Sequence, residues 1–146
     1  ITWSGLDQKW SADEVLAEIA QAGYDGAPAG PGPLSVEETN AQYQAHGLRP
    51  APGYLSGEFW NRAAEGALLE RAHAVGAFSQ ALGITEVYVA ANGFNEYFTP
   101  RGLTRAQVAG HVTAEDSMSD AEFEQFAALS CALPARQDLH VGVLAV

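Results

Sequence analysis

Cysteine and positive charge are both scarce in this sequence of 146 residues. Cys131 is the single cysteine, so neither an internal disulfide nor a cysteine-based zinc site is expected. Seven Lys and Arg stand against eighteen Asp and Glu, which gives a net charge of −11 at pH 7. So few cations cannot build the basic stripe that phosphates require, and the sequence therefore predicts no nucleic-acid partner and no anionic membrane partner.

Several other signals are missing. No apolar run reaches the length of a membrane span and no signal segment opens the chain, so we expect a cytoplasmic protein. The glycine-rich pattern of nucleotide-binding loops is absent, as is the Gly-x-Ser-x-Gly elbow of hydrolases. The four histidines show no metal-pair spacing, so no metal site is expected within these residues.

Both ends of the sequence are apolar. Ile1 stands where an initiator Met is expected and opens a strand-like stretch, and the apolar run Val141–Val146 stops without a turn. Natural termini usually lie in polar, exposed segments. We therefore expect residues 1–146 to form a single domain that is part of a longer polypeptide.

Four helices are predicted. Three of them begin with a capping box, in which a Ser is followed three residues later by Glu. The pairs are Ser11 with Glu14, Ser35 with Glu38, and Ser119 with Glu122. The fourth helix is expected over Phe59–Leu82, where a stripe of Leu68, Ala72, Val75, Ser79 and Leu82 repeats at helical spacing before Gly83. In the last helix, Phe123, Phe126 and Ala127 are expected on the core face and Cys131 in the core.

Five strands are predicted between and around these helices. They are Ile1–Trp3, Tyr24–Ala27, Leu48–Tyr54, Glu86–Ala91 and His140–Val146. Pro50 and Pro52 weaken the third because proline cannot donate to a strand ladder. The last two are nearly continuous apolar runs, which is typical of parallel strands that are covered on both faces.

Alternating strands and helices predict a parallel α/β sheet with right-handed crossovers. One architecture is a partial (β/α)8 TIM barrel of about five parallel strands and four helices, with the strands in sequential order and the helices on one side. The alternative is a doubly wound open sheet, in which the strand order reverses. The length favours the open sheet, because a complete barrel needs about 250 residues. The apolar ends favour the barrel.

Ligands are expected at the loops that follow the carboxyl ends of the strands. The segment Gly53–Trp60 brings Tyr54, Glu58 and two further aromatic residues together. Rings beside a carboxylate often bind a sugar, with the rings on C–H faces and the acid on hydroxyls. The alternative is that Phe59 and Trp60 begin the long helix and pack into the core.

The longest loop runs from Asn92 to Met118, a length typical of lids and binding loops. Asn92 directly follows a strand and can both donate and accept hydrogen bonds, and Glu96 is close behind it. The alternative is that Asn92 and Gly93 form a simple tight turn. Together with Trp3 and Tyr54, Asn92 and Glu96 are the predicted substrate-binding residues. The catalytic residues stay unknown.

With its elements in this order, the chain resembles the N-terminal half of the xylose-isomerase-like TIM-barrel superfamily of sugar isomerases, epimerases and inosose dehydratases. The matching stretches are Ile1–Trp3, Val15–Gly26, Gly47–Pro50, Leu82–Gly83, Val87–Val89, Met118–Phe126 and Val141–Val146. Their order and spacing carry the likeness. The family often has a Glu shortly after the Tyr-Asp-Gly turn, whereas here Gly26 is followed by Ala27 and Pro28.

The resemblance implies a metal-dependent proton or hydride shift next to a carbonyl, acting on a sugar or cyclitol. It also implies a divalent metal (Mn, Mg, Co or Zn) in the intact protein, with ligands from strand five onward, so none is expected on this stretch alone. The implied partner is a small sugar or polyol, and a homo-oligomer stays open. The alternative function is a non-catalytic α/β module that binds a small molecule.

Overall fold

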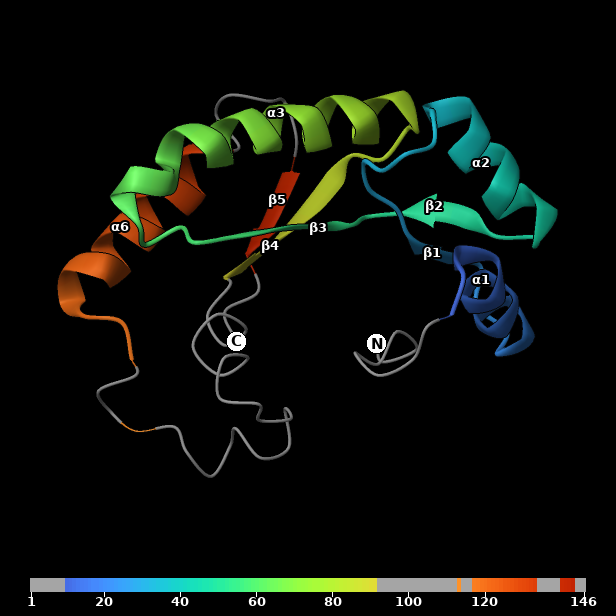
Figure 1. Cartoon of the computed structure of the whole chain (residues 1–146), viewed down its shortest axis with the longest axis horizontal. Helices are drawn as coiled ribbons and strands as arrows, with labels where there is room; N and C mark the ends of the chain where they lie inside the picture. Colours follow the sequence, from blue (N-terminus) through green and yellow to red (C-terminus); the bar gives the residue numbers. More distant parts are fainter. Residues whose placement is uncertain (1–9, 92–112, 114–116, 134–139, 144–146) are drawn as a thin grey trace.

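Helices and strands alternate along the chain (Figure 1). The computed structural model describes residues 10–91, 113, 117–133 and 140–143. In chain order, the elements are α1 (Ala12–Gln21), β1 (Gly26–Pro28), α2 (Val36–Ala45), β2 (Arg49–Ala51), β3 (Tyr54–Gly57), the 3-10 turn η1 (Arg62–Ala64), α3 (Glu65–Ala81), β4 (Glu86–Ala91), α6 (Asp120–Ala132) and β5 (His140–Val143).

All pairings between the described strands are parallel. β1 pairs with β2, and β3, β4 and β5 form a second sheet in that order. Neighbouring strands thus follow each other in the sequence, and among the described strands the order does not reverse. The predicted parallel α/β class is confirmed. The described strands do not close a barrel, and the predicted first strand, Ile1–Trp3, lies outside the described residues.

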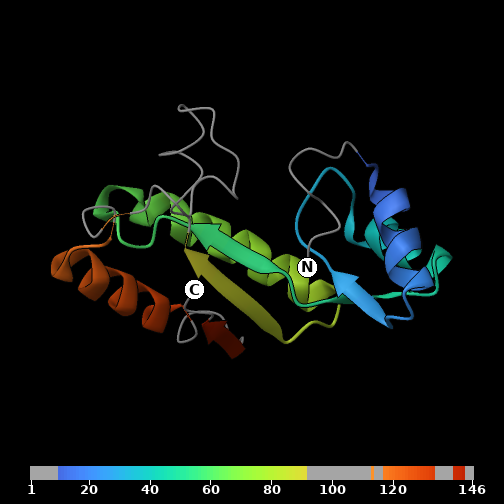
Figure 2. The same cartoon turned by 90° about the horizontal axis from the view of Figure 1, so that it is seen from below.

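The two faces of the strands differ. Leu55, Val87 and Val89 are buried, and because side chains alternate along a strand, Tyr54 and Tyr88 point to the other face. Figure 1 shows α2 and α3 above the strands, and Figure 2, from below, shows β3 and β4 in front of α3. The buried residues therefore face α3, and the two tyrosines lie on the face that α3 leaves uncovered, which we call the inner face.

The core consists of two clusters. The first packs β3 and β4 against α3 and α6, through Leu55, Phe59, Leu68, Ala72, Val87, Val89, Leu129 and Leu133. The second packs α1 and α2 on β1 and on the segment that leads into β4, through Leu16, Ile19, Ala27, Ala29, Tyr43, Leu48 and Ile84. Most of the predicted stripe on α3 faces the first cluster: Leu68 and Ala72 belong to it and Val75 packs against it. Ser79 is buried, and Leu82 packs against the second cluster.

All three predicted capping boxes are present. In the first, the Ser11 amide donates to Glu14 Oε2 over 2.7 Å and the Glu14 amide donates to Ser11 Oγ over 3.3 Å. These hydrogen bonds satisfy amide groups that a helix start otherwise leaves unpaired. At the other helix ends, Gly23, Gly47 and Gly83 have φ angles of 83°, 71° and 73°, the left-handed conformation that closes a helix.

The predicted third strand is broken in two. β2 ends at Ala51, β3 begins at Tyr54, and Pro52 and Gly53 separate them. The Arg49 amide and the Ala51 carbonyl both bond towards β1, to Asp25 and Ala29. Beyond the break, the Gly53 carbonyl accepts from the Tyr88 amide on the opposite side. The segment thus changes partner edge at Pro52, where proline has no amide to continue the ladder.

Two side chains and one helix boundary differ from the prediction. α3 begins at Glu65 rather than at Phe59, because Asn61 starts η1 first. In α6, Phe123 is 62% exposed and Cys131 is exposed, whereas Leu129, Ser130 and Leu133 are buried. Among the described elements, only the later turns of α6 pack on the first core cluster, so the first turn leaves Phe123 uncovered by them.

Replacing Gly53 with Ala is expected to destabilise the protein by about 1–3 kcal/mol. A Cβ at this position would lie 2.1 Å from the Ala29 carbonyl oxygen, so the backbone at position 29 or at position 53 has to move. The control is Gly66→Ala near the start of α3, where a Cβ meets nothing within 4 Å and where Ala stabilises a helix by about 0.5 kcal/mol. Urea unfolding followed by circular dichroism measures both, and equal stability of the two variants would contradict the close approach.

The capping boxes predict how stability depends on pH. Hydrogen bonds from Ser11, Ser35 and Ser119 lower the pKa values of Glu14, Glu38 and Glu122 below the ordinary value of 4.5. A lowered folded-state pKa stabilises the protein above the unfolded-state pKa, and this contribution is lost as the pH falls through the folded-state values. Unfolding free energies should therefore decline below about pH 4.5.

The test variant replaces the three capping glutamates with Gln, which keeps a capping side chain but cannot ionise. Its loss of stability between about pH 5 and pH 2 should be smaller than that of the original protein. The matched control replaces Glu18, Glu70 and Glu124, which lie outside the capping boxes. If both triple variants follow the same pH profile, the capping carboxylates are not the groups responsible.

Candidate functional site at the carboxyl end of strand three

The structure describes only one of the four predicted substrate-binding residues. Trp3, Asn92 and Glu96 lie outside the described residues, so their predicted roles stay predictions. Tyr54 is described, 44% exposed on the inner face, with its ring centroid 5.7 Å from that of Tyr88. The two rings are tilted by 44° and form an aromatic pair across β3 and β4.

Tyr54 lies at the opposite end of its strand from the position predicted. We expected it at the carboxyl end, but it is the first residue of β3, and the strand continues to Gly57. Three residue steps of about 3.3 Å separate it from that end. The loop that follows the strand therefore begins at Glu58, so of the predicted loop Gly53–Trp60 only the residues from Glu58 onward lie beyond the strand.

Glu58 is the first residue beyond β3, and Asn61 holds its side chain. Asn61 Nδ2 donates to Glu58 Oε2 over 2.8 Å in a half-buried environment. The Asn61 side-chain oxygen accepts from the Ala63 amide over 3.0 Å and so caps η1. The Asn61 amide also donates to the Glu58 carbonyl over 3.0 Å. Asn61 is thus bonded on both sides, and it fixes the orientation of the carboxylate.

Phe59 anchors this loop in the core. Its side chain is 0% exposed, and its ring meets that of Phe126 edge to face at 5.9 Å and 85°. The predicted alternative that Phe59 is a core residue is confirmed, although it precedes the helix. Trp60, the next residue, is only half-buried. Glu58, Trp60 and Asn61 together form what we call the β3 carboxyl-end site.

A second set of polar side-chain contacts lies next to this site, between η1, α3 and α6. Arg62 donates to Gln125 Oε1 over 3.1 Å, and Gln125 Nε2 donates to Glu65 Oε2 over 3.3 Å. These bonds connect α6 to the start of α3. Because exposed polar contacts contribute little stability each, their main effect is to orient the two helix segments beside the loop.

Asn61 was not singled out from the sequence. Its signal is local: an acid directly after a strand, and Asn three residues later, at the start of a helical turn. Asn is among the residues that most often cap a helix start, so the pattern predicts the cap. That the amide group also reaches back to Glu58 depends on the geometry of the turn.

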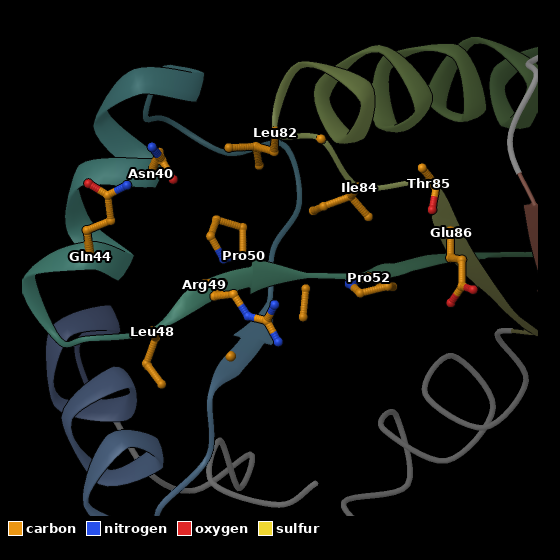
Figure 3. Close-up of a pocket in the computed structure, with 13 residues that line it drawn as sticks. Asn40, Gln44, Leu48, Arg49, Pro50, Pro52, Leu82, Ile84, Thr85 and Glu86 are labelled. Atoms are coloured by element: carbon orange, nitrogen blue, oxygen red, sulfur yellow. The ribbon is translucent and has the colours of Figure 1, made fainter.

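A cavity of about 690 Å³ lies at the other end of the strands (Figure 3). It lies between α2, the segment around β2 and the connection from α3 to β4. Its polar lining consists of Asn40, Gln44, Arg49, Thr85 and Glu86. The sequence analysis did not foresee this cavity, because its walls come from three segments that are distant in the sequence.

The part of the chain that the structure describes does not fit a divalent-metal site. No group of three His, Cys, Asp or Glu side chains gathers there. His46, which closes α2, contacts Asp13 of α1 instead, with Nε2 3.1 Å from Oδ1. Hydrogen bonding to His46 and Gln42 lowers the pKa of Asp13. This cluster joins two helices and leaves no open set of ligands.

No protein-family model, no curated protein and no solved structure matches this chain. Among the described residues, no helix is long and apolar enough to cross a membrane.

Two substitutions of Asn61 separate its roles. Asn61→Ala removes both the cap of η1 and the bond to Glu58, and we expect it to lower the unfolding free energy by about 1 kcal/mol. Asn61→Ser keeps a capping oxygen but cannot donate to Glu58 in the same way, so it should recover most of that loss. Urea unfolding measures the unfolding free energies of the two variants. Equal destabilisation by both would show that Asn61 does not stabilise the protein through the cap.

Proposed function

We propose that this chain is part of a (β/α)8-type barrel that acts on a sugar or cyclitol as an isomerase, epimerase or dehydratase, by a proton or hydride shift next to a carbonyl. The sequential parallel strands and the strand–helix alternation support this proposal, together with the resemblance to the xylose-isomerase-like superfamily. The observation that carries it is the fixed carboxylate of Glu58, held by Asn61 over 2.8 Å directly after a strand.

The chemistry of the β3 carboxyl-end site suits a polyol. An ionised carboxylate accepts hydrogen bonds only, and two adjacent hydroxyls can donate to its two oxygens. Trp60 supplies an indole ring, whose face can stack on the C–H groups of a sugar. Because Asn61 orients Glu58 before a ligand binds, little side-chain entropy is lost on binding.

The proposed role of this site is to bind and orient the substrate. The carboxyl ends of parallel strands share one edge of a sheet, so Asn92 and Glu96 after β4, and Trp3 after the predicted first strand, are the proposed neighbours of Glu58. A divalent metal stays part of the proposal, with ligands outside the described residues. No proton-transfer group is assigned among the described residues.

A non-catalytic module that binds a small molecule is the second candidate. The cavity at the amino ends of the strands favours it, since its volume of about 690 Å³ falls in the range of small-molecule sites. In this case the chain would bind a ligand without any carbonyl chemistry.

Ligand-observed NMR with a panel of aldoses, ketoses and inositols tests the proposed binding. Glu58→Gln and Trp60→Leu should each weaken sugar binding by about 1–3 kcal/mol, because each removes a direct contact. The controls are Glu70→Gln, an exposed acid on α3, and Trp10→Leu, an indole that is 42% exposed near α1. Equal effects in the site and control variants would remove the sugar assignment from this site.

Aldose–ketose interconversion with added Mn²⁺ or Mg²⁺, measured on the intact protein that carries the expected metal ligands, separates the two functions. Turnover that Glu58→Gln reduces supports the enzyme. Sugar binding without turnover supports the module, and the absence of both excludes the site as a sugar site in this chain.

A further inference from the structure

Two prolines explain the cavity at the amino ends of the strands: Pro50 lies in β2, and Pro52 follows it directly. The Arg49 amide and the Ala51 carbonyl form hydrogen bonds with the β1 side. Because the backbone polar groups of successive residues in a strand point to opposite edges, those of Pro50 and Pro52 point to the other edge, towards β4. The register of Tyr54 with Tyr88 places Glu86 beside Pro52. Because proline has no amide donor, the ladder between β2 and this part of β4 is missing and the strands separate.

The walls of this opening are partly apolar. Pro50, Pro52, Leu82 and Ile84 line its middle, as Figure 3 shows. Asn40 and Gln44 are one turn apart on α2 and form one wall. A ligand in the cavity thus meets aliphatic surface in the centre and hydrogen-bonding groups around it, which is the usual composition of a small-molecule site.

Two opposite charges complete the lining. Arg49 and Glu86 are both exposed, and Figure 3 shows them on either side of Pro52. Among the described arginines, Arg62 donates to Gln125 and Arg71 donates to the Ser56 carbonyl. Arg49 has no side-chain partner within the described ranges, and Glu86 has none there either. The two charges are therefore both accessible and not neutralised by each other.

We propose that this cavity binds a small zwitterion, either an amino acid with an apolar side chain or a short apolar peptide. The carboxylate of the ligand pairs with the Arg49 guanidinium, its ammonium group pairs with Glu86, and its apolar part packs on the proline and leucine walls. Asn40 and Gln44 supply donors and acceptors for a peptide or carboxylate group.

The charges of the cavity match this class of ligand better than others. A dianionic phosphate would meet one arginine in a protein of net charge −11, and a simple cation would meet Arg49 as well as Glu86. A zwitterion satisfies both groups without adding net charge.

This inference does not rest on the proposed sugar-directed function; it names a ligand class for the cavity that favours the second candidate. The cavity lies at the amino ends of the strands, and the β3 carboxyl-end site lies at the opposite end. Failure of sugar binding would therefore leave the cavity proposal intact, and failure of zwitterion binding would leave the sugar proposal intact.

Four probes test the charges one at a time. The ¹⁵N-labelled chain is titrated with L-leucine, L-leucyl-L-leucine, N-acetyl-L-leucine and L-leucinamide, and the backbone amide signals of Gly26, Gly83 and Thr85 report on the cavity. One or both zwitterions should shift these signals with a dissociation constant on the order of 1 mM. The acetylated probe has lost the ammonium group and leucinamide the carboxylate, so each should bind about five- to tenfold more weakly than leucine. Comparing leucine with leucyl-leucine distinguishes the amino acid from the peptide.

Two variants assign each charge to its partner. Arg49→Gln should abolish the preference for leucine over leucinamide, and Glu86→Gln should abolish the preference for leucine over N-acetyl-leucine. Both residues are exposed at strand starts, and circular dichroism verifies that the variants fold. Arg62→Gln and Glu70→Gln, outside the cavity, should keep both preferences. The proposal is overturned if neither zwitterion shifts the signals at about 20 mM, if all four probes bind equally, or if the two cavity variants keep both preferences.

Discussion

The segment from Arg49 to Gly57 has to pair with two neighbours, and it lacks amide donors at two of its positions. Pro50 and Pro52 cannot donate to the strand on the β4 side, so β2 bonds to β1 and only β3, beyond Gly53, bonds to β4. The two sheets thus share one continuous stretch of chain but no common ladder. Both core clusters, the cavity and the start of the β3 loop are positioned by this change of partner.

Close contacts hold the two halves together despite the missing ladder. The Ala29 carbonyl oxygen lies so near Gly53 that only glycine fits there, and Ile84, next to β4, packs with the cluster of α1, α2 and β1. Tyr43 adds a half-buried hydrogen bond from its hydroxyl to the Pro28 carbonyl at 2.5 Å. Burial also raises the pKa of Tyr43, so this donor stays protonated throughout the neutral range.

The same geometry gives the two ends of the strands different chemistry. At the carboxyl end of β3, Phe59 anchors the loop and Asn61 orients Glu58, so the carboxylate is held before any ligand arrives. At the amino ends, the gap opposite Pro50 and Pro52 leaves Arg49 and Glu86 without partners among the described residues. One end therefore offers a fixed acceptor beside an indole, and the other offers a separated pair of charges around an aliphatic centre.

The sequence by itself determined the features that depend on neighbours along the chain. Each Ser–Glu capping box is a contact over three residues, and each left-handed glycine follows its own helix, so these helix ends could be predicted. The parallel class followed from the alternation of strands and helices. Only the tertiary structure decided where Tyr54 lies, that Phe123 and Cys131 are exposed, and that the third strand changes partner at Pro52. These outcomes depend on which distant segment packs beside each residue. The spacing of apolar side chains along the sequence does not show which turns of a helix pack on the sheet, or which neighbouring strand a segment pairs with.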